Sequence, residues 1–299
     1  MNLSGHHLTT WYDRSGDFRD YQGSVNIDAN GATFSAATGK SFAISAPITA
    51  APNALLTIGT TEAINGVSRT GDVILWNANN DIYNIRVTGG VTLQCGKSSY
   101  GKRAEHLNAD PNVAVQIELA NGTLEVGHDN LDPNVQRINY GDDVTVTADS
   151  EIGAFIATYK ADARNKEIYF RDLTIGNHTL TVSHNGGGDG TAIGFDGNIT
   201  LTDSAGTTIA GSSAKLKLNG LVQGPGKLIK VDNGRLYLTG EDNTFAGGID
   251  ASGGAMYLDG NDTLGSGLAY LDATDLEINA SQNGDIEMHG EADLTVNVA

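Results

Sequence analysis

An apolar pair returns with a constant period of 20 through the last third of the chain, and a polar or amphipathic residue separates the two members. Alternation of this kind is typical of a β-strand with one buried and one solvated face. A shift of one residue would turn the buried side chains outward, so a constant period predicts strands stacked in register. A repeat of this length indicates a solenoid. The pairs are Leu216/Leu218, Leu236/Leu238, Met256/Leu258, Leu276/Ile278 and Val296/Val298.

Other positions recur with the pairs. Gly220, Gly240 and Gly260 each follow an apolar pair by two positions, where a strand must turn or neighbouring backbones come close. A second apolar column, through Leu228, Leu268 and Met288, indicates at least two strands per coil. No sustained helical periodicity accompanies them. The predicted fold class is therefore all-β, a right-handed parallel β-helix or β-solenoid with coils of about 20–25 residues.

The organisation of the chain changes once. Residues 1–22 concentrate aromatic and charged side chains and are predicted to be an N-terminal cap or boundary segment; an interface or the remnant of a preceding domain is the alternative. Residues 23–299 are predicted to be the solenoid, most regular, with its period of 20, over 214–299. Residues 1–20 lack a continuous hydrophobic run, so no signal peptide is expected, and no membrane-spanning segment is expected in the chain.

Charge and cysteine content narrow the range of possible partners and chemistries. The chain has 36 acidic and 18 basic residues, a net charge of −18. Such a surface repels phosphate backbones and anionic membranes, so nucleic acid and membrane insertion are not expected. The lone Cys95 lies in a strand-like run and is predicted to be a small core residue.

One segment carries a family signature. Residues 234–267 resemble the autotransporter-associated β-strand repeat, whose motif runs Gly-x-Leu-x-Leu-x-Gly, Asn-Thr-aromatic, Gly-Gly, a second strand and Leu-Gly-Ser-Gly. The resemblance implies a β-helical passenger region at the bacterial cell surface or outside the cell, exported as part of a longer protein. It implies as partners further coils of the same or a neighbouring chain, and host or matrix glycans or proteins. The matching residues are Gly234–Gly240, Asn243–Phe245, Gly247–Gly248, Ala255–Leu258 and Leu264–Gly267.

The expected function is a non-catalytic stalk or adhesin segment of a large surface protein. Metalloprotease, nucleophile-elbow, P-loop and dinucleotide motifs do not occur in the sequence. A carbohydrate-binding or carbohydrate-cleaving β-helix is one alternative. For it, Tyr237 and Tyr257 share an outward column and could form a platform for a sugar ring, with Trp76 and Tyr83 as further aromatic candidates.

Acidic residues are candidates for catalysis in that alternative and for binding a cation. Asp232 and Asp272, two coils apart with Ser252 between them, are a weak catalytic pair. Glu241, Asp242 and Asp262 recur at one phase of adjacent coils and are weak calcium candidates; no other metal and no cofactor is predicted.

The end of the sequence suggests a further alternative. The apolar positions Leu294, Val296 and Val298 form a strand-like end without a polar cap. An uncapped strand can pair with another chain, so these residues are candidates for an assembly strand in an extracellular fibre that grows end to end. The other interpretation is that the chain is a fragment of a longer stalk.

Overall fold

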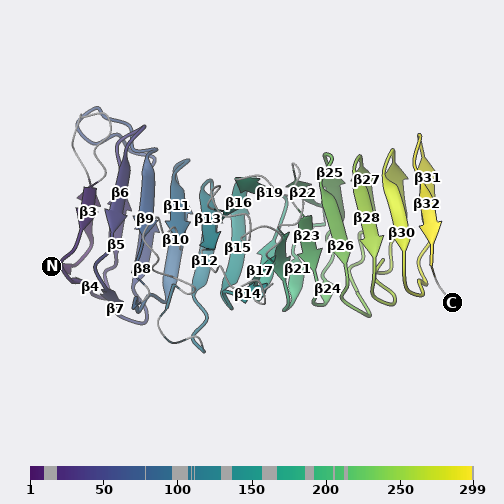
Figure 1. Ribbon diagram of the computed structural model, residues 1–299, viewed down its shortest axis with the longest axis horizontal. Helices are drawn as coiled ribbons and strands as arrows, with labels where there is room; N and C mark the ends of the chain where they lie inside the picture. The colour runs from purple at the N-terminus through teal and green to yellow at the C-terminus, as the bar shows by residue number, and fades with distance from the viewer. Residues whose placement is uncertain are drawn as a thin grey trace.

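The computed structural model describes residues 1–9, 19–77, 79–95, 107–108, 110, 112–128, 137–156, 167–185, 192–204, 206–211 and 215–297. Within these residues the secondary structure is all-β, and the strands of every sheet pair in parallel. Successive coils lie side by side along the long axis, with the two termini at opposite ends (Figure 1). This arrangement is consistent with a β-helix. In the same residues, no helix long and apolar enough to cross a membrane occurs.

In the described part of the chain four sheets run along the axis, and a coil adds one strand to each of two or three of them. Sheet A contains β1 (Asn2–Leu3), β4 (Val25–Ile27) and β7 (Ile48–Ala50). Sheet B contains β2 (His6–Thr9), β5 (Ala32–Ser35), β8 (Leu55–Ile58), β10 (Asn84–Thr88), β12 (Gln116–Ala120), β15 (Asp143–Ala148), β18 (Leu173–Ile175), β21 (Ile199–Leu201) and β24 (Val222–Gln223).

The other two sheets reach further towards the C-terminus. Sheet C contains β3 (Arg19–Tyr21), β6 (Ser41–Ile44), β9 (Asp72–Leu75), β11 (Thr92–Cys95), β13 (Thr123–His128), β16 (Ser150–Ile156), β19 (Thr179–Asn185), β22 (Thr207–Gly211), β25 (Leu228–Val231), β27 (Ile249–Ser252), β29 (Ala269–Asp272) and β31 (Ile286–His289). Sheet D contains β14 (Arg137–Asn139), β17 (Glu167–Phe170), β20 (Ala192–Phe195), β23 (Lys215–Leu218), β26 (Arg235–Leu238), β28 (Ala255–Leu258), β30 (Asp275–Ile278) and β32 (Leu294–Val296).

Coil length varies more than the sequence period predicts. Leu236 pairs with Met256, as a period of 20 requires. The coil from Asn84 to its partner Gln116 is more than one and a half times as long as this period. The expected coil length therefore holds for only part of the chain. The described strands keep their parallel registers in spite of this difference in coil length.

The period of 20 holds for the coils around the end of sheet B, including the coil from Leu216 to Leu236, which still contains β24. Sheet B ends at β24, and the coils that follow contribute strands only to sheets C and D. The apolar pairs from Leu216/Leu218 to Leu276/Ile278 stack in register, which confirms that part of the prediction.

Two details of the predicted columns are wrong. Leu276 and Ile278 pair with Leu294 and Val296, not with Val296 and Val298, because the last coil is two positions shorter than the period. Val298 lies outside the described residues. In sheet C, Leu228 pairs with Ile249, which pairs with Ala269.

Leu268 is consequently not a core residue. It immediately precedes β29, outside the paired column, and its side chain is 48% exposed. The coil from Leu228 to Ile249 is one position longer than the period and displaces the column accordingly, so a fixed period of 20 selects the wrong residue.

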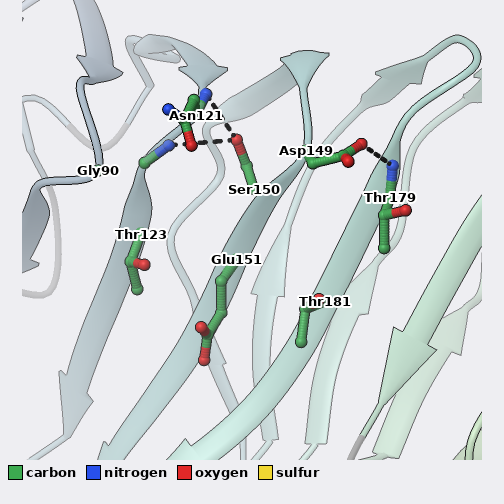
Figure 2. Close-up of a pocket in the computed structure, with 9 residues that line it drawn as sticks. Gly90, Asn121, Thr123, Asp149, Ser150, Glu151, Thr179 and Thr181 are labelled. Atoms are coloured by element: carbon green, nitrogen blue, oxygen red, sulfur yellow. Dashed lines mark hydrogen bonds between the residues drawn. The ribbon is translucent and has the colours of Figure 1, made fainter. Parts of the chain in front are cut away.

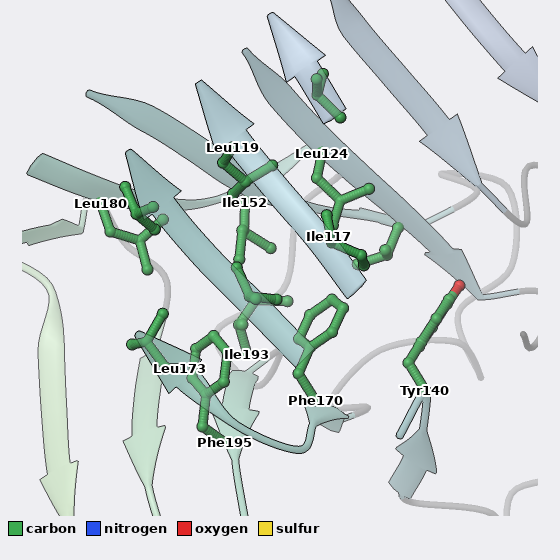
Figure 3. Close-up of a cluster of buried hydrophobic side chains, with 14 of the residues drawn as sticks. Ile117, Leu119, Leu124, Tyr140, Ile152, Phe170, Leu173, Leu180, Ile193 and Phe195 are labelled. Atoms are coloured by element: carbon green, nitrogen blue, oxygen red, sulfur yellow. The ribbon is translucent and has the colours of Figure 1, made fainter. Parts of the chain in front are cut away.

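The core is a continuous column of inward side chains. Tyr140, Phe170 and Phe195 stack through consecutive coils of sheet D, with ring centroids 5.6 and 5.7 Å apart (Figure 3). Aliphatic residues of sheets B and C, among them Leu119 and Ile152, complete this part of the core. Cys95 is buried as predicted, and burial raises the pKa of its thiol, which makes it a poor nucleophile.

The N-terminal residues take part in the first coil. β1 and β2 pair with β4 and β5, and β3 pairs with β6. The aromatic residues Trp11, Tyr12 and Phe18 lie outside the described residues, so the division of the chain at residue 22 stays a prediction.

Candidate functional site

A pocket of about 350 Å³ opens on the outer face of sheet C, over the first residues of β13, β16 and β19 (Figure 2). Three of its residues form one row across the strands, because Thr123 pairs with Glu151 and Glu151 pairs with Thr181. Side chains of one row on a sheet project to the same face. The pocket is lined by Gly90, Asn121, Gly122, Thr123, Asp149, Ser150, Glu151, Thr179 and Thr181.

Hydrogen bonds between coils hold the upper rim of the pocket. The hydroxyl of Ser150 accepts from the backbone N–H groups of Asn121 at 3.1 Å and Gly122 at 3.3 Å, and it donates to the carbonyl of Ala148 at 2.9 Å. One oxygen of Asp149 accepts from the N–H of Thr179 at 2.8 Å (Figure 2). These bonds tie three consecutive coils together, so the rim is preorganised.

Next to the pocket residue Glu151, strand β16 has a position without a side chain. Gly153 lies two positions beyond Glu151 on β16, and its register partners are Glu125 and Ser183. A Cβ at Gly153 would lie 3.1 Å from the Ser183 hydroxyl and 3.8 Å from Cγ of Glu125. The Ser183 hydroxyl donates to Glu151 and fixes that carboxylate. Two carboxylates and a hydroxyl therefore surround a position with no side chain.

The chemistry of the pocket is hydroxyl and carboxylate. Its lining residues include three threonines, a serine, an asparagine, Asp149 and Glu151, and no lysine, arginine or histidine is among them. One oxygen of each carboxylate accepts one of the hydrogen bonds described above. This set can exchange hydrogen bonds with a polar ligand.

The predicted tyrosine column is present on sheet D. The rings of Tyr237 and Tyr257 stack with their centroids 4.3 Å apart and an angle of 7° between planes. Nζ of Lys217, on the preceding strand, lies 5.4 Å from the Tyr237 centroid. One face of each ring is thus covered by the other, and Lys217 lies at the second face of Tyr237. Burial raises the pKa of the Tyr237 hydroxyl to about 12.

The remaining carbohydrate candidates are not brought together. Trp76 follows β9 of sheet C and Tyr83 precedes β10 of sheet B, so neither shares a strand row with the tyrosine column of sheet D. Asp232 and Asp272 do not share a column either. Ser252 pairs with Asp272, but the pairing of Lys230 with Ala251 aligns Val231, not Asp232, with Ser252.

The three weak calcium candidates lie in turns of adjacent coils. Asp242 and Asp262 have φ of 54° and 52°, a left-handed conformation that aspartate tolerates better than most residues. Asn261 donates to Glu241 at 3.3 Å. Within the described ranges, no group of three or more His, Cys, Asp or Glu residues could hold a metal ion. The turn geometry accounts for the aspartates, and calcium binding stays a prediction.

The candidate assembly strand corresponds in part to β32. Leu294 and Val296 are 55% and 58% exposed, and β32 is the last strand in the order of sheet D. Pairing with another chain at this strand stays a prediction.

The pocket was not predicted from the sequence. Its row residues Thr123, Glu151 and Thr181 are far apart in the chain and come from coils of unequal length. The sequence shows only that each of these residues occupies an outward position in an alternating strand. Many surface threonines and glutamates occupy such positions, so this pattern does not identify a pocket.

Comparison with curated proteins finds a distant relative. The chain is 26% identical over 293 residues to the Adhesin BmaC autotransporter of Brucella suis biovar 1 (strain 1330), covering 95% of this chain and 8% of that protein. The chain therefore corresponds to a small part of the length of the curated relative it matches. No protein-family model matches the chain, and no solved structure matches it. The comparisons thus show that this β-sheet chain is distantly similar to a bacterial autotransporter adhesin.

Proposed function

We propose that this chain is a non-catalytic, right-handed β-helical segment in the passenger region of a bacterial surface adhesin. The observation that carries the proposal is the similarity to an autotransporter adhesin over 95% of the chain, combined with parallel registers that continue from β2 to β32. The likeness of residues 234–267 to the autotransporter-associated repeat supports the same conclusion.

The physical properties of the fold suit a segment exposed outside a cell. Each coil contacts only its neighbours, so length can be added without a new core. Backbone hydrogen bonds and a continuous apolar column hold the rod, and Cys95, the single cysteine, is buried. The net charge of −18 keeps the surface strongly hydrated.

The proposal is tested by displaying the chain on a bacterial surface. The chain is fused to the translocator of a laboratory autotransporter, and protease resistance of the displayed segment is measured together with adherence of the cells to host cells and matrix. We expect a folded, protease-resistant segment that increases adherence over the translocator alone. Gly220→Ala, which we expect to disrupt coil stacking, serves as the control and should lose both properties.

Catalysis is tested separately on the purified chain with a broad polysaccharide panel. We expect no depolymerisation. Cleavage that disappears in Glu151→Gln or Glu125→Gln would contradict the non-catalytic assignment. Failure of the displayed segment to increase adherence in any assay would contradict the adhesin assignment.

A further inference from the structure

We propose that the pocket on sheet C binds a neutral sugar residue of a glycan. This inference rests on the proposed function and deepens it, because it names a site and a ligand class through which an adhesin segment would adhere. The pocket has a volume of about 350 Å³ and is open towards solvent. It is also distinct from the tyrosine column, which lies on sheet D.

The hydrogen-bonding groups of the pocket match a polyol. Thr123, Thr179 and Thr181 supply hydroxyls, each of which can both donate and accept. Asp149 and Glu151 supply acceptors beside them. A sugar hydroxyl also donates and accepts, so it can use both kinds of group. An ammonium or guanidinium group has no acceptor and would use these hydroxyls only as acceptors.

Charge excludes an acidic ligand. Among the described residues that line the pocket, none is cationic and two are carboxylates. A uronate, sulfate or phosphate group would therefore meet repulsion without a compensating ion pair. A metal ion is disfavoured as well, since the described residues hold no cluster of three or more metal-ligating side chains at the pocket or elsewhere. The neutral glycan is the ligand class that these conditions leave.

The pocket is held in a fixed shape before any ligand arrives. Ser150 spans two backbone N–H groups of the previous coil, and Asp149 accepts from Thr179 of the next coil. Glu151 is fixed by the hydroxyl of Ser183. Since the strands that carry these residues are buried on their inner face, binding requires little reordering, which reduces the entropic cost of recognition.

The experiment measures binding of the whole chain to neutral oligosaccharides of glucose, galactose, mannose, fucose and N-acetylglucosamine, by saturation-transfer NMR and calorimetry. We expect at least one of them to bind. Thr181→Val and Glu151→Gln should each weaken binding about 10-fold, the effect of one lost hydrogen bond to a sugar hydroxyl. Thr181→Tyr, which fills the pocket, should abolish it.

Thr174→Val and Thr174→Tyr are the matched controls, because Thr174 is a half-buried outward threonine of β18 in sheet B. They should bind as the unmodified chain does, and circular dichroism should show all variants folded. If Thr181→Tyr fails to fold, Thr123→Val replaces it.

Absence of binding to every oligosaccharide would overturn the inference. So would binding unchanged in the pocket variants, or binding only of polylysine or of calcium ions. Loss of adherence in the display assay with glycan binding intact would instead contradict the proposed function alone.

Discussion

The buried carboxylate of Asp142 accepts a hydrogen bond of 3.0 Å from the backbone N–H of Val115, one coil earlier, while its second oxygen has no partner. Asn243 makes the same contact to the N–H of Val222, and its amide also donates to the carbonyl of Thr263 at 2.9 Å. At this kind of position between coils, an asparagine therefore uses its side-chain oxygen as an acceptor and its NH2 group as a donor. An ionised aspartate lacks the donor and leaves one buried oxygen unsatisfied.

Asp142→Asn should stabilise the chain at neutral pH and remove a pH dependence. Burial raises the pKa of the Asp142 carboxyl to about 7, from 3.8, with Asp143 raising it further and Arg171 opposing. The folded state thus keeps a proton that the unfolded state has lost, and the free energy of unfolding falls as pH rises from about 4 to about 7. The variant should lack this slope.

The measurement is urea unfolding of both proteins at pH 5.5 and pH 8. We expect the stability difference between Asp142→Asn and the unmodified chain to grow by about 2 kcal/mol over this interval. Asp143→Asn tests the neighbouring carboxylate, which is paired with Arg171. Equal slopes in Asp142→Asn and the unmodified chain would show that Asp142 does not titrate in this range.

Lys230 produces a pH dependence of the opposite sign. It is buried on β25, opposite Ala251, and Nζ donates to the carbonyls of Asp232 at 2.9 Å and Gly253 at 2.6 Å. Burial lowers the pKa of Lys230 to about 8, from 10.5. The unfolded state then binds more protons between these values, so the free energy of unfolding rises with pH.

Lys230→Met should remove this rise. Between pH 7.5 and pH 9.5 we expect the unmodified chain to gain about 2 kcal/mol relative to the variant, measured by urea unfolding. Lys227→Met is the control, because Lys227 is more exposed and lies 3.8 Å from Asp250. A stability difference that does not change with pH would contradict the assignment of the titration to Lys230.

Ala273→Gly should stabilise the chain. Ala273 is exposed and has φ of 47°, while the corresponding turn of the previous coil contains Gly253 with φ of 77°. A left-handed conformation costs a residue with a Cβ about 1–2 kcal/mol, and glycine avoids this cost. Glycine also has greater conformational freedom in the unfolded chain, which cancels part of the gain. We expect a net gain of about 0.5–1 kcal/mol in thermal or urea unfolding. Ala255→Gly, within β28, should instead lose stability.

The sequence predicted the parts of this fold in which coil length is constant. The apolar pairs of β23, β26, β28 and β30 and the stacking of Tyr237 on Tyr257 follow directly from a period of 20. The pocket could not be predicted in this way. Longer coils of unequal length bring Thr123, Glu151 and Thr181 together, and a fixed period has no information on such lengths.

The same reason explains the errors at the C-terminus. A shortened last coil moves Leu294 and Val296, instead of Val296 and Val298, beneath Leu276 and Ile278. Register is set by inward side chains and backbone pairing, which tolerate changes of coil length as long as the alternation is kept. Sequence alone shows the alternation but not where a turn is shortened.

Gly220→Ala tests why glycine recurs after the apolar pairs. Gly220 does not have a positive φ, but a Cβ there would lie 1.6 Å from the carbonyl oxygen of Gly197 in the previous coil. The neighbouring atom is backbone, so the clash can be relieved only by separating the coils. We expect a loss of about 3 kcal/mol or more in the free energy of unfolding. Gly153→Ala is the matched control, since the nearest neighbour of its Cβ would be the Ser183 hydroxyl at 3.1 Å, a side-chain atom that can move, and stability should change little. If the two substitutions change the free energy of unfolding by similar amounts, the close stacking of coils does not require glycine at these positions. The glycines would then be needed only for the local conformation of the turns.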